Sequence, residues 1–112
     1  MSIRKLERKD WGPFLDYLSK LCEGRQAEIG AESLALGDQV EARWLPLIGI
    51  TFDPKDDLIE FALEGLDHLI HWPREVYIDE GNESITSLEI IDADGVRQIA
   101  KFKEPLMLPP PR

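Results

Sequence analysis

The spacing of apolar residues changes at Gly24, and this change limits the fold more than any other feature of the chain. After Gly24, apolar and polar residues alternate in short runs, which is typical of strands with one buried face. Before Gly24, apolar residues recur every three or four positions, as on one face of a helix; they are Trp11, Phe14, Leu15, Leu18, Leu21 and Cys22. The sequence therefore predicts one helix over residues 10–23, followed by an antiparallel β body over residues 25–104.

Turn-forming residues divide the β body into six or seven short strands. Asp53-Pro54-Lys55-Asp56 and Ala93-Asp94-Gly95 stand between alternating runs and predict two hairpins. In the most apolar stretch, residues 45–52, an internal proline and glycine indicate a bend or bulge. Residues 66–72 fit either one helical turn or a short strand, and the pattern alone leaves both open.

These elements predict an α+β domain in which the N-terminal helix packs on a strongly bent antiparallel sheet or small open barrel. The order of elements resembles SH3-like and Sm-like barrels by fold analogy, and such barrels host many unrelated functions. A chain of 112 residues is expected to form a single domain, residues 1–112. Residues 1–9 are expected as an N-terminal arm and residues 105–112 as an extended proline-rich tail.

The charge of the chain argues against two classes of partner. There are 22 acidic and 13 basic side chains, a formal net charge of −9 at pH 7, and the acidic excess lies after residue 25. Neutralisation of phosphate by Lys and Arg supplies most of the affinity for nucleic acids, and anionic lipid surfaces attract the same side chains. We therefore expect no nucleic-acid partner and no membrane partner. RNA binding, which an Sm-like topology suggests, is the weakest hypothesis.

Sequence motifs of enzymes and of exported proteins are absent. The N-terminus lacks the apolar core of a signal peptide, and no apolar run approaches the roughly 20 residues of a membrane span, so we expect a cytoplasmic protein. Neither a phosphate-binding glycine loop nor a Gly-x-Ser-x-Gly elbow occurs. Cys22, the only cysteine, lies on the apolar face of the predicted helix, where a buried and inert thiol is the usual case. The sequence thus predicts no catalytic residue and no cofactor.

The best candidate for a metal site is the segment from Glu64 to His71, which holds both histidines of the chain. On a helical turn, His68 and His71 would share a face, with Glu64 one turn before them and Asp67 beside them. On a strand, residues three apart point to opposite faces and the cluster falls apart. The candidate metal ligands are therefore Glu64, Asp67, His68 and His71, and the alternative is two partly exposed histidines without a ligand.

Two tryptophans stand beside prolines where elements are expected to end, in Trp44-Leu45-Pro46-Leu47-Ile48 and Trp72-Pro73-Arg74. Trp and Arg are enriched among the few residues that carry most of an interface's binding energy. The candidate contact residues are Trp44, Leu47, Trp72 and Arg74. The alternative is that both tryptophans close the ends of the core. If they are exposed instead, a self-paired dimer explains them best.

Several sequence blocks together resemble a small bacterial family catalogued only as a domain of unknown function. The blocks are the run from Trp44 to Asp57, the run from Glu64 to Ile70, Pro73-Arg74-Glu75, Asp92-Ala93-Asp94-Gly95 and the closing Pro105-Leu106-Met107-Leu108-Pro109. The resemblance covers nearly the whole chain and implies a bacterial single-domain protein. It carries over no activity, cofactor or catalytic residue.

Two functional hypotheses follow from these observations. The leading one is a small acidic domain without catalytic activity that binds itself, as a homodimer, or another protein. The alternative is a metal-binding or metal-dependent protein that uses the Glu64, Asp67, His68 and His71 cluster. Exposure of the tryptophans would favour the first hypothesis, and convergence of the histidines would favour the second.

Overall fold

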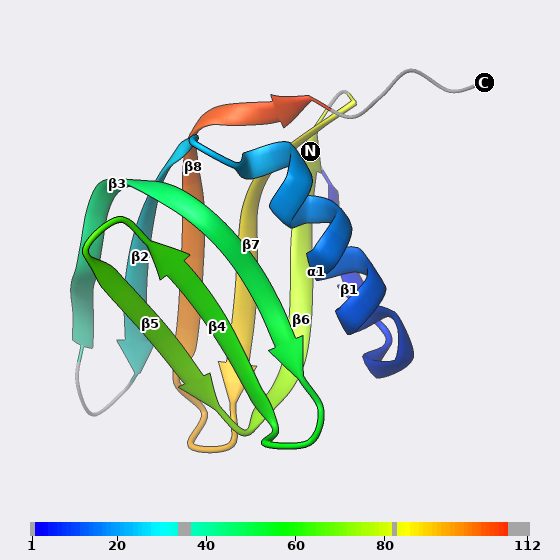
Figure 1. Ribbon diagram of the computed structural model, residues 1–112. Coiled ribbons are helices and arrows are strands. Elements are labelled where there is room, and N and C mark those ends of the chain that lie inside the picture. The colour runs from blue at the N-terminus through cyan, green and yellow to red at the C-terminus, as the bar shows by residue number, and fades with distance from the viewer. Residues whose placement is uncertain (1, 34–36, 82, 108–112) are drawn as a thin grey trace.

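Eight strands form one antiparallel sheet in the computed structural model, which describes residues 2–33, 37–81 and 83–107 (Figure 1). One helix, α1, covers part of this sheet. In chain order the elements are β1 (Ser2–Leu6), α1 (Arg8–Cys22), β2 (Gln26–Ser33), β3 (Gly37–Asp53), β4 (Leu58–Leu63), β5 (Leu66–His71), β6 (Pro73–Gly81), β7 (Ser84–Asp92) and β8 (Arg97–Met107).

The expected α+β class, with a strongly bent sheet or small open barrel, is wrong. Strands make up 69% of the described residues and the helix 15%, so the architecture is mainly β. The strand order is β1-β6-β7-β8-β2-β3-β4-β5, so β1 and β5 are the two edges of the sheet. A barrel requires the terminal strands to hydrogen-bond to each other, and these two do not pair, so the sheet stays open.

Both edge strands lie in segments that the alternation pattern had not assigned to strands. Residues 2–6 of the expected N-terminal arm form β1, which pairs antiparallel with β6. The ambiguous residues 66–72 contain β5, which pairs antiparallel with β4. At the other terminus, residues 105–107 of the expected tail continue β8. The remainder of that tail, residues 108–112, lies outside the described residues.

The long strand β3 connects the two parts of the sheet. Its first half pairs with β2 and its second half with β4, and the register shifts twice in the first half and once in the second. The first two shifts lie between Val40 and Leu45, and the third, between Leu47 and Gly49, confirms the bulge expected within residues 45–52. Register shifts of this kind bend a strand. As a result, β3 crosses in front of β8, β7 and β6 in Figure 1, and β4 and β5 follow its direction.

The helix α1 packs against the second half of β3 and fixes its path. It begins two residues before the predicted start and buries the predicted stripe, with Trp11, Leu15, Leu18 and Cys22 inside. Ser19 Oγ accepts a hydrogen bond from Ile50 N at 2.7 Å and donates one to Ile50 O at 2.5 Å. Because Ile50 follows the bulge, these bonds hold α1 to the point where β3 changes partner.

The core lies between α1 and the facing sides of the sheet. It consists mainly of aliphatic side chains, together with three aromatic rings, Trp11, Phe61 and Phe102, all buried. The alternation in β4 places Ile59, Phe61 and Leu63 in this core. Within the described ranges, the helix falls short of the length and hydrophobicity that a membrane span requires.

Candidate functional site

The strand β5 is an edge strand whose outer side is unpaired. Its six residues pair with β4 in one continuous register without a bulge, and the strand order ends there. Proteins commonly protect such edges with Lys, Pro or a bulge, because unpaired N–H and C=O groups attract other strands. The sequence of β5, Leu66-Asp67-His68-Leu69-Ile70-His71, contains none of these. This strand therefore presents a regular edge without Lys, Pro or a bulge, and Asp67 is its one carboxylate.

The opposite edge, β1, is protected by charge. Arg4 Nη2 lies 2.9 Å from Glu80 Oε1, and Lys5 Nζ lies 3.1 Å from Glu75 Oε1, so both cations are paired with the neighbouring strand β6. Hydrogen bonds from Tyr77 and Lys5 lower the pKa of Glu75, and the hydrogen bond to Glu75 raises the pKa of Lys5. The two edges of the sheet thus differ in chemistry as well as in position.

Trp72 follows β5 directly and is exposed. Its side chain is 59% exposed, and its backbone is in the left-handed region with φ at +52°. The backbone is held on both sides: Trp72 N donates to Asp57 O and Trp72 O accepts from Ala93 N, each at 2.9 Å. Arg8 Nη2 in turn lies 2.8 Å from Asp57 Oδ1, which ties this corner to the start of α1. A fixed corner therefore presents the indole to solvent.

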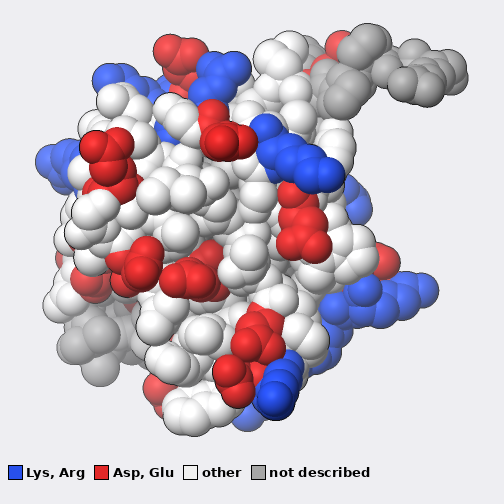
Figure 2. Space-filling view, in the orientation of Figure 1, with Lys and Arg blue, Asp and Glu red and all other residues white. Residues whose placement is uncertain are grey.

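Two further apolar side chains on β5 are exposed. Leu66 is 38% exposed and Leu69 is 43% exposed, so three large apolar groups occur within seven residues. We call residues 66–72 the β5 edge. The neighbouring charge is acidic, because residues 58–71 contain Glu60, Glu64 and Asp67 but no Lys or Arg. Figure 2 shows acidic and uncharged atoms over the region of β4 and β5, with basic side chains toward the margins.

The candidate metal ligands are not brought together, because residues 66–71 form a strand and not a helical turn. His68 and His71 point to opposite faces of β5. His68 is half-buried with Nε2 at 2.5 Å from Gln98 Oε1, whereas His71 is exposed beside Trp72. Asp67 and Glu64 are exposed at the strand and the preceding turn. Among residues 2–33, 37–81 and 83–107, no group of three or more His, Cys, Asp and Glu side chains could hold a metal ion.

The four candidate contact residues lie in different environments. Leu47 is 1% exposed and belongs to the core. Trp44 is half-buried in the bend of β3, also with φ at +52°. Trp72 and Arg74 are exposed, on either side of the buried Pro73. Of the two tryptophans, only Trp72 is therefore exposed, although Ile48 of the first motif is 61% exposed. The sequence reasoning missed Leu66 and Leu69, which a strand assignment for residues 66–71 would have placed beside Trp72.

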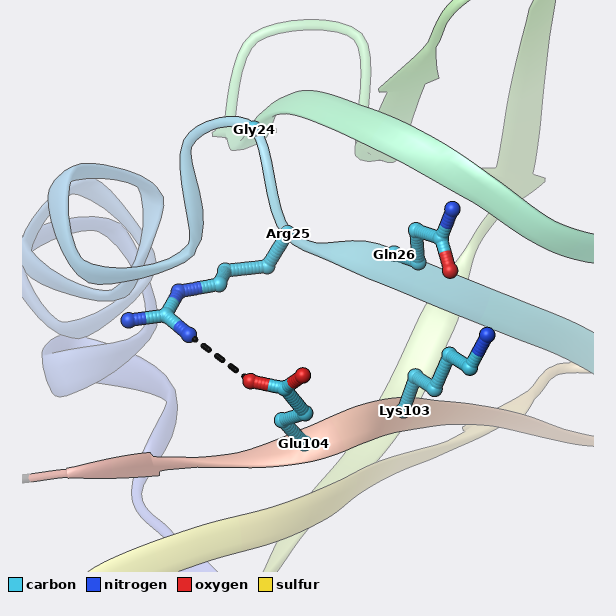
Figure 3. Close-up of a pocket in the computed structure, with 5 residues that line it drawn as sticks. All are labelled: Gly24, Arg25, Gln26, Lys103 and Glu104. Carbon is cyan, nitrogen blue, oxygen red and sulfur yellow. Dashed lines mark hydrogen bonds and ion pairs between the residues drawn. The ribbon is translucent and has the colours of Figure 1, made fainter.

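The hollow shown in Figure 3 lies where α1, β2 and β8 meet. It encloses about 310 Å³ and is lined by Gly24, Arg25, Gln26, Lys103 and Glu104. Arg25 Nη1 and Glu104 Oε2 point toward each other at 3.3 Å across it. All five residues are exposed. The hollow is thus a polar notch already crossed by an ion pair, and it is a weaker candidate than the β5 edge.

Cys22, the last residue of α1, is fully buried on the inner face of that helix. Burial in this apolar setting raises the pKa of its thiol from the ordinary 9.0 to about 12. The thiol therefore stays protonated at neutral pH, and the reactive thiolate is not formed there. This environment agrees with the inert thiol that the helical pattern predicted.

Comparisons with known proteins place the chain in a family without an assigned function. An uncharacterized protein of Aquifex aeolicus (strain VF5) is similar to it, with 36% identity over 110 residues, which cover 97% of this chain and 99% of that protein. No solved structure matches the chain. A family model described as "Family of unknown function (DUF5335)" matches residues 2–111. The chain therefore belongs to the family of unknown function DUF5335, as the resemblance of its sequence blocks indicated.

Proposed function

We propose that this protein is a protein-interaction domain and that the β5 edge is its contact surface. The observation that carries the proposal is the exposed Trp72, held by its backbone at the end of an unprotected edge strand. Extended polypeptide segments add to such edges through main-chain hydrogen bonds, while side chains beside the edge give specificity. Tryptophan is among the residues that most often dominate the binding energy of an interface.

Rigidity of the site supports the same proposal. Binding is weakened when side chains or loops must be ordered at the interface. At this site β4 pairs with β5 over its full length, and Trp72 is held by two backbone hydrogen bonds. The surface offered to a partner is therefore formed before binding.

Site-specific photo-crosslinking in the native host cells tests this function. Leu69 is replaced by p-benzoylphenylalanine, and the matched control carries the same group at Tyr17, which is 39% exposed on α1. We expect a discrete crosslinked protein species from position 69 and none from position 17. Equal crosslinking from both positions, or no crosslinking from position 69, would contradict the assignment of the β5 edge as a contact surface.

A further inference from the structure

We infer that the partner of the β5 edge is a second copy of this chain, paired antiparallel about a two-fold axis at Leu69. This inference rests on the proposed function and names its partner. We infer a second copy because the side chains of residues 66–72 are complementary, in one register, to the same residues of another copy.

Symmetry limits how two β5 edges can meet. A two-fold axis perpendicular to the sheet makes the edges antiparallel and keeps the core-facing sides of both copies on the same side. Directly opposed residues then point to the same face, because side chains alternate along a strand. Ile70 faces the core and pairs with the buried Ile59, so Asp67, Leu69 and His71 point to the other face. Each allowed register is therefore centred on a residue.

The register centred on Leu69 matches every exposed side chain of the β5 edge. Leu69 lies opposite its own copy. Asp67 lies opposite His71 of the second copy, and the same pair occurs twice by symmetry. His68 lies opposite Ile70 of the second copy, both on the core side. At each end, Leu66 lies at the position of Trp72 of the second copy, which directly follows β5 with a left-handed backbone. Exposed apolar groups thus meet exposed apolar groups, and a carboxylate meets an imidazole, which are the favourable cross-strand combinations.

The neighbouring registers lose these matches. With the axis at His68, Asp67 lies opposite Leu69 and Leu66 lies opposite the buried Ile70, which leaves Trp72 without an apolar partner. With the axis at Ile70, Leu69 lies opposite His71, and Trp72 lies opposite His68, which is already hydrogen-bonded to Gln98. Complementarity therefore selects the register at Leu69.

A cationic segment of another protein is the competing occupant, because residues 58–71 contain three carboxylates and no Lys or Arg. Such a segment would be attracted by charge, but it would not explain why the apolar and charged positions of residues 66–72 match in reverse order. A second copy explains that match. The two occupants give different outcomes in the experiment below.

Engineered cysteines distinguish the registers. Directly opposed residues on antiparallel strands are close enough for a disulfide. The variants are Leu69→Cys, Asp67→Cys and His71→Cys, each purified and oxidised with glutathione disulfide. The unchanged protein is the background control, because Cys22 is fully buried. All three engineered positions are exposed, so random collision should affect them alike.

We expect Leu69→Cys alone to form a covalent dimer. Asp67→Cys and His71→Cys should form no disulfide when separate and a covalent dimer when mixed, because each position faces the other. No crosslink above background in any variant or mixture would overturn the second copy as partner. A crosslink in a mixture of Asp67→Cys with Leu69→Cys, without one in Leu69→Cys alone, would overturn the register.

Exchanging Asp67 and His71 tests the same register independently and without engineered cysteines. Asp67→His places two histidines opposite each other, and His71→Asp places two aspartates opposite each other. Each single variant should therefore weaken the dimer about tenfold or more in sedimentation equilibrium. The double variant restores an Asp–His pair at both places and should recover the affinity. If the double variant is as weak as the single ones, the pairing is wrong. Photo-crosslinking from position 69 to a protein of another mass, with no self-crosslinking, would refute the dimer and leave the proposed function standing.

Discussion

Trp72 combines a strained backbone with an exposed ring. A bulky residue with φ near +52° is uncommon, and the left-handed region costs of the order of 1–3 kcal/mol for a residue other than glycine. The surrounding structure maintains this conformation through the hydrogen bonds to Asp57 and Ala93. Nothing in the core requires the indole, because most of it is in solvent. Backbone strain and side-chain function can therefore be separated at this position.

Replacement Trp72→Gly tests that separation. Glycine adopts the left-handed region without steric strain, so the free energy of unfolding of the monomer should stay the same or rise by about 1 kcal/mol. Self-association should weaken at least tenfold, because the apolar contact with Leu66 is lost. Urea unfolding at low protein concentration and sedimentation equilibrium measure the two effects. Trp44→Gly, with the same φ but a half-buried ring, is the control and should leave association unchanged. Unchanged association in Trp72→Gly would refute the role of the indole.

Contact between α1 and β3 determines where the sheet changes direction. Ser19 satisfies both the N–H and the C=O of Ile50, immediately after the bulge in β3. A Cβ built on Gly49 would lie 3.8 Å from Ser19 Oγ, an ordinary van der Waals contact, so the approach does not depend on a glycine there. The path of β4 and β5 follows from that bend. The helix therefore positions the β5 edge although it contributes no residue to it.

Replacement Ser19→Ala should destabilise the fold by about 1–3 kcal/mol, because two backbone groups of Ile50 lose their partner inside the α1–β3 contact. The midpoint of urea unfolding measures the loss. The control is Asp16→Ala, an exposed position on the same helix, where a change within about 0.5 kcal/mol is expected. If the two variants are equally stable, Ser19 does not hold the contact.

Local patterns predicted those elements whose periodicity is clear. The buried stripe of α1 was visible in the spacing of apolar residues, and the hairpin between β7 and β8 in its Asp-Gly turn. The β5 edge was not predicted, because six residues are too few to separate a helical turn from a strand by periodicity. Long-range pairing decides that question, and β4 supplies it. The same pairing separates His68 from His71, so the metal cluster expected from the sequence is not assembled among the described residues.

At the scale of the whole molecule, an open sheet has two edge strands whose unpaired backbone groups can bind other strands. Among the described strands, β1 and β5 are these edges, and only β1 carries paired cations. Association through β5 would join two copies into one continuous sheet of twice the width. The contact is one short strand pair with a few apolar groups, and interfaces at the small end of the size range are weak and reversible.

Thermal stability should therefore depend on protein concentration. A partner that binds only the folded state raises the apparent stability by mass action, so the Tm should rise by a few degrees between about 1 and about 100 µM protein. Differential scanning calorimetry at both concentrations measures it. Leu69→Lys, which opposes two like charges at the axis, should show the same Tm at both concentrations. A concentration-independent Tm in the unchanged protein would argue against self-association.

The ion pairs on β1 also limit how far assembly proceeds. A molecule with two receptive ends could add further copies without limit and form filaments. Here Arg4 and Lys5 guard one end of the sheet, through their pairs with Glu80 and Glu75. If two copies pair through β5 as proposed, β5 is used by the first partner and β1 is guarded, so the described strands offer no further edge. Assembly would then stop at two chains and would not extend into a fibre.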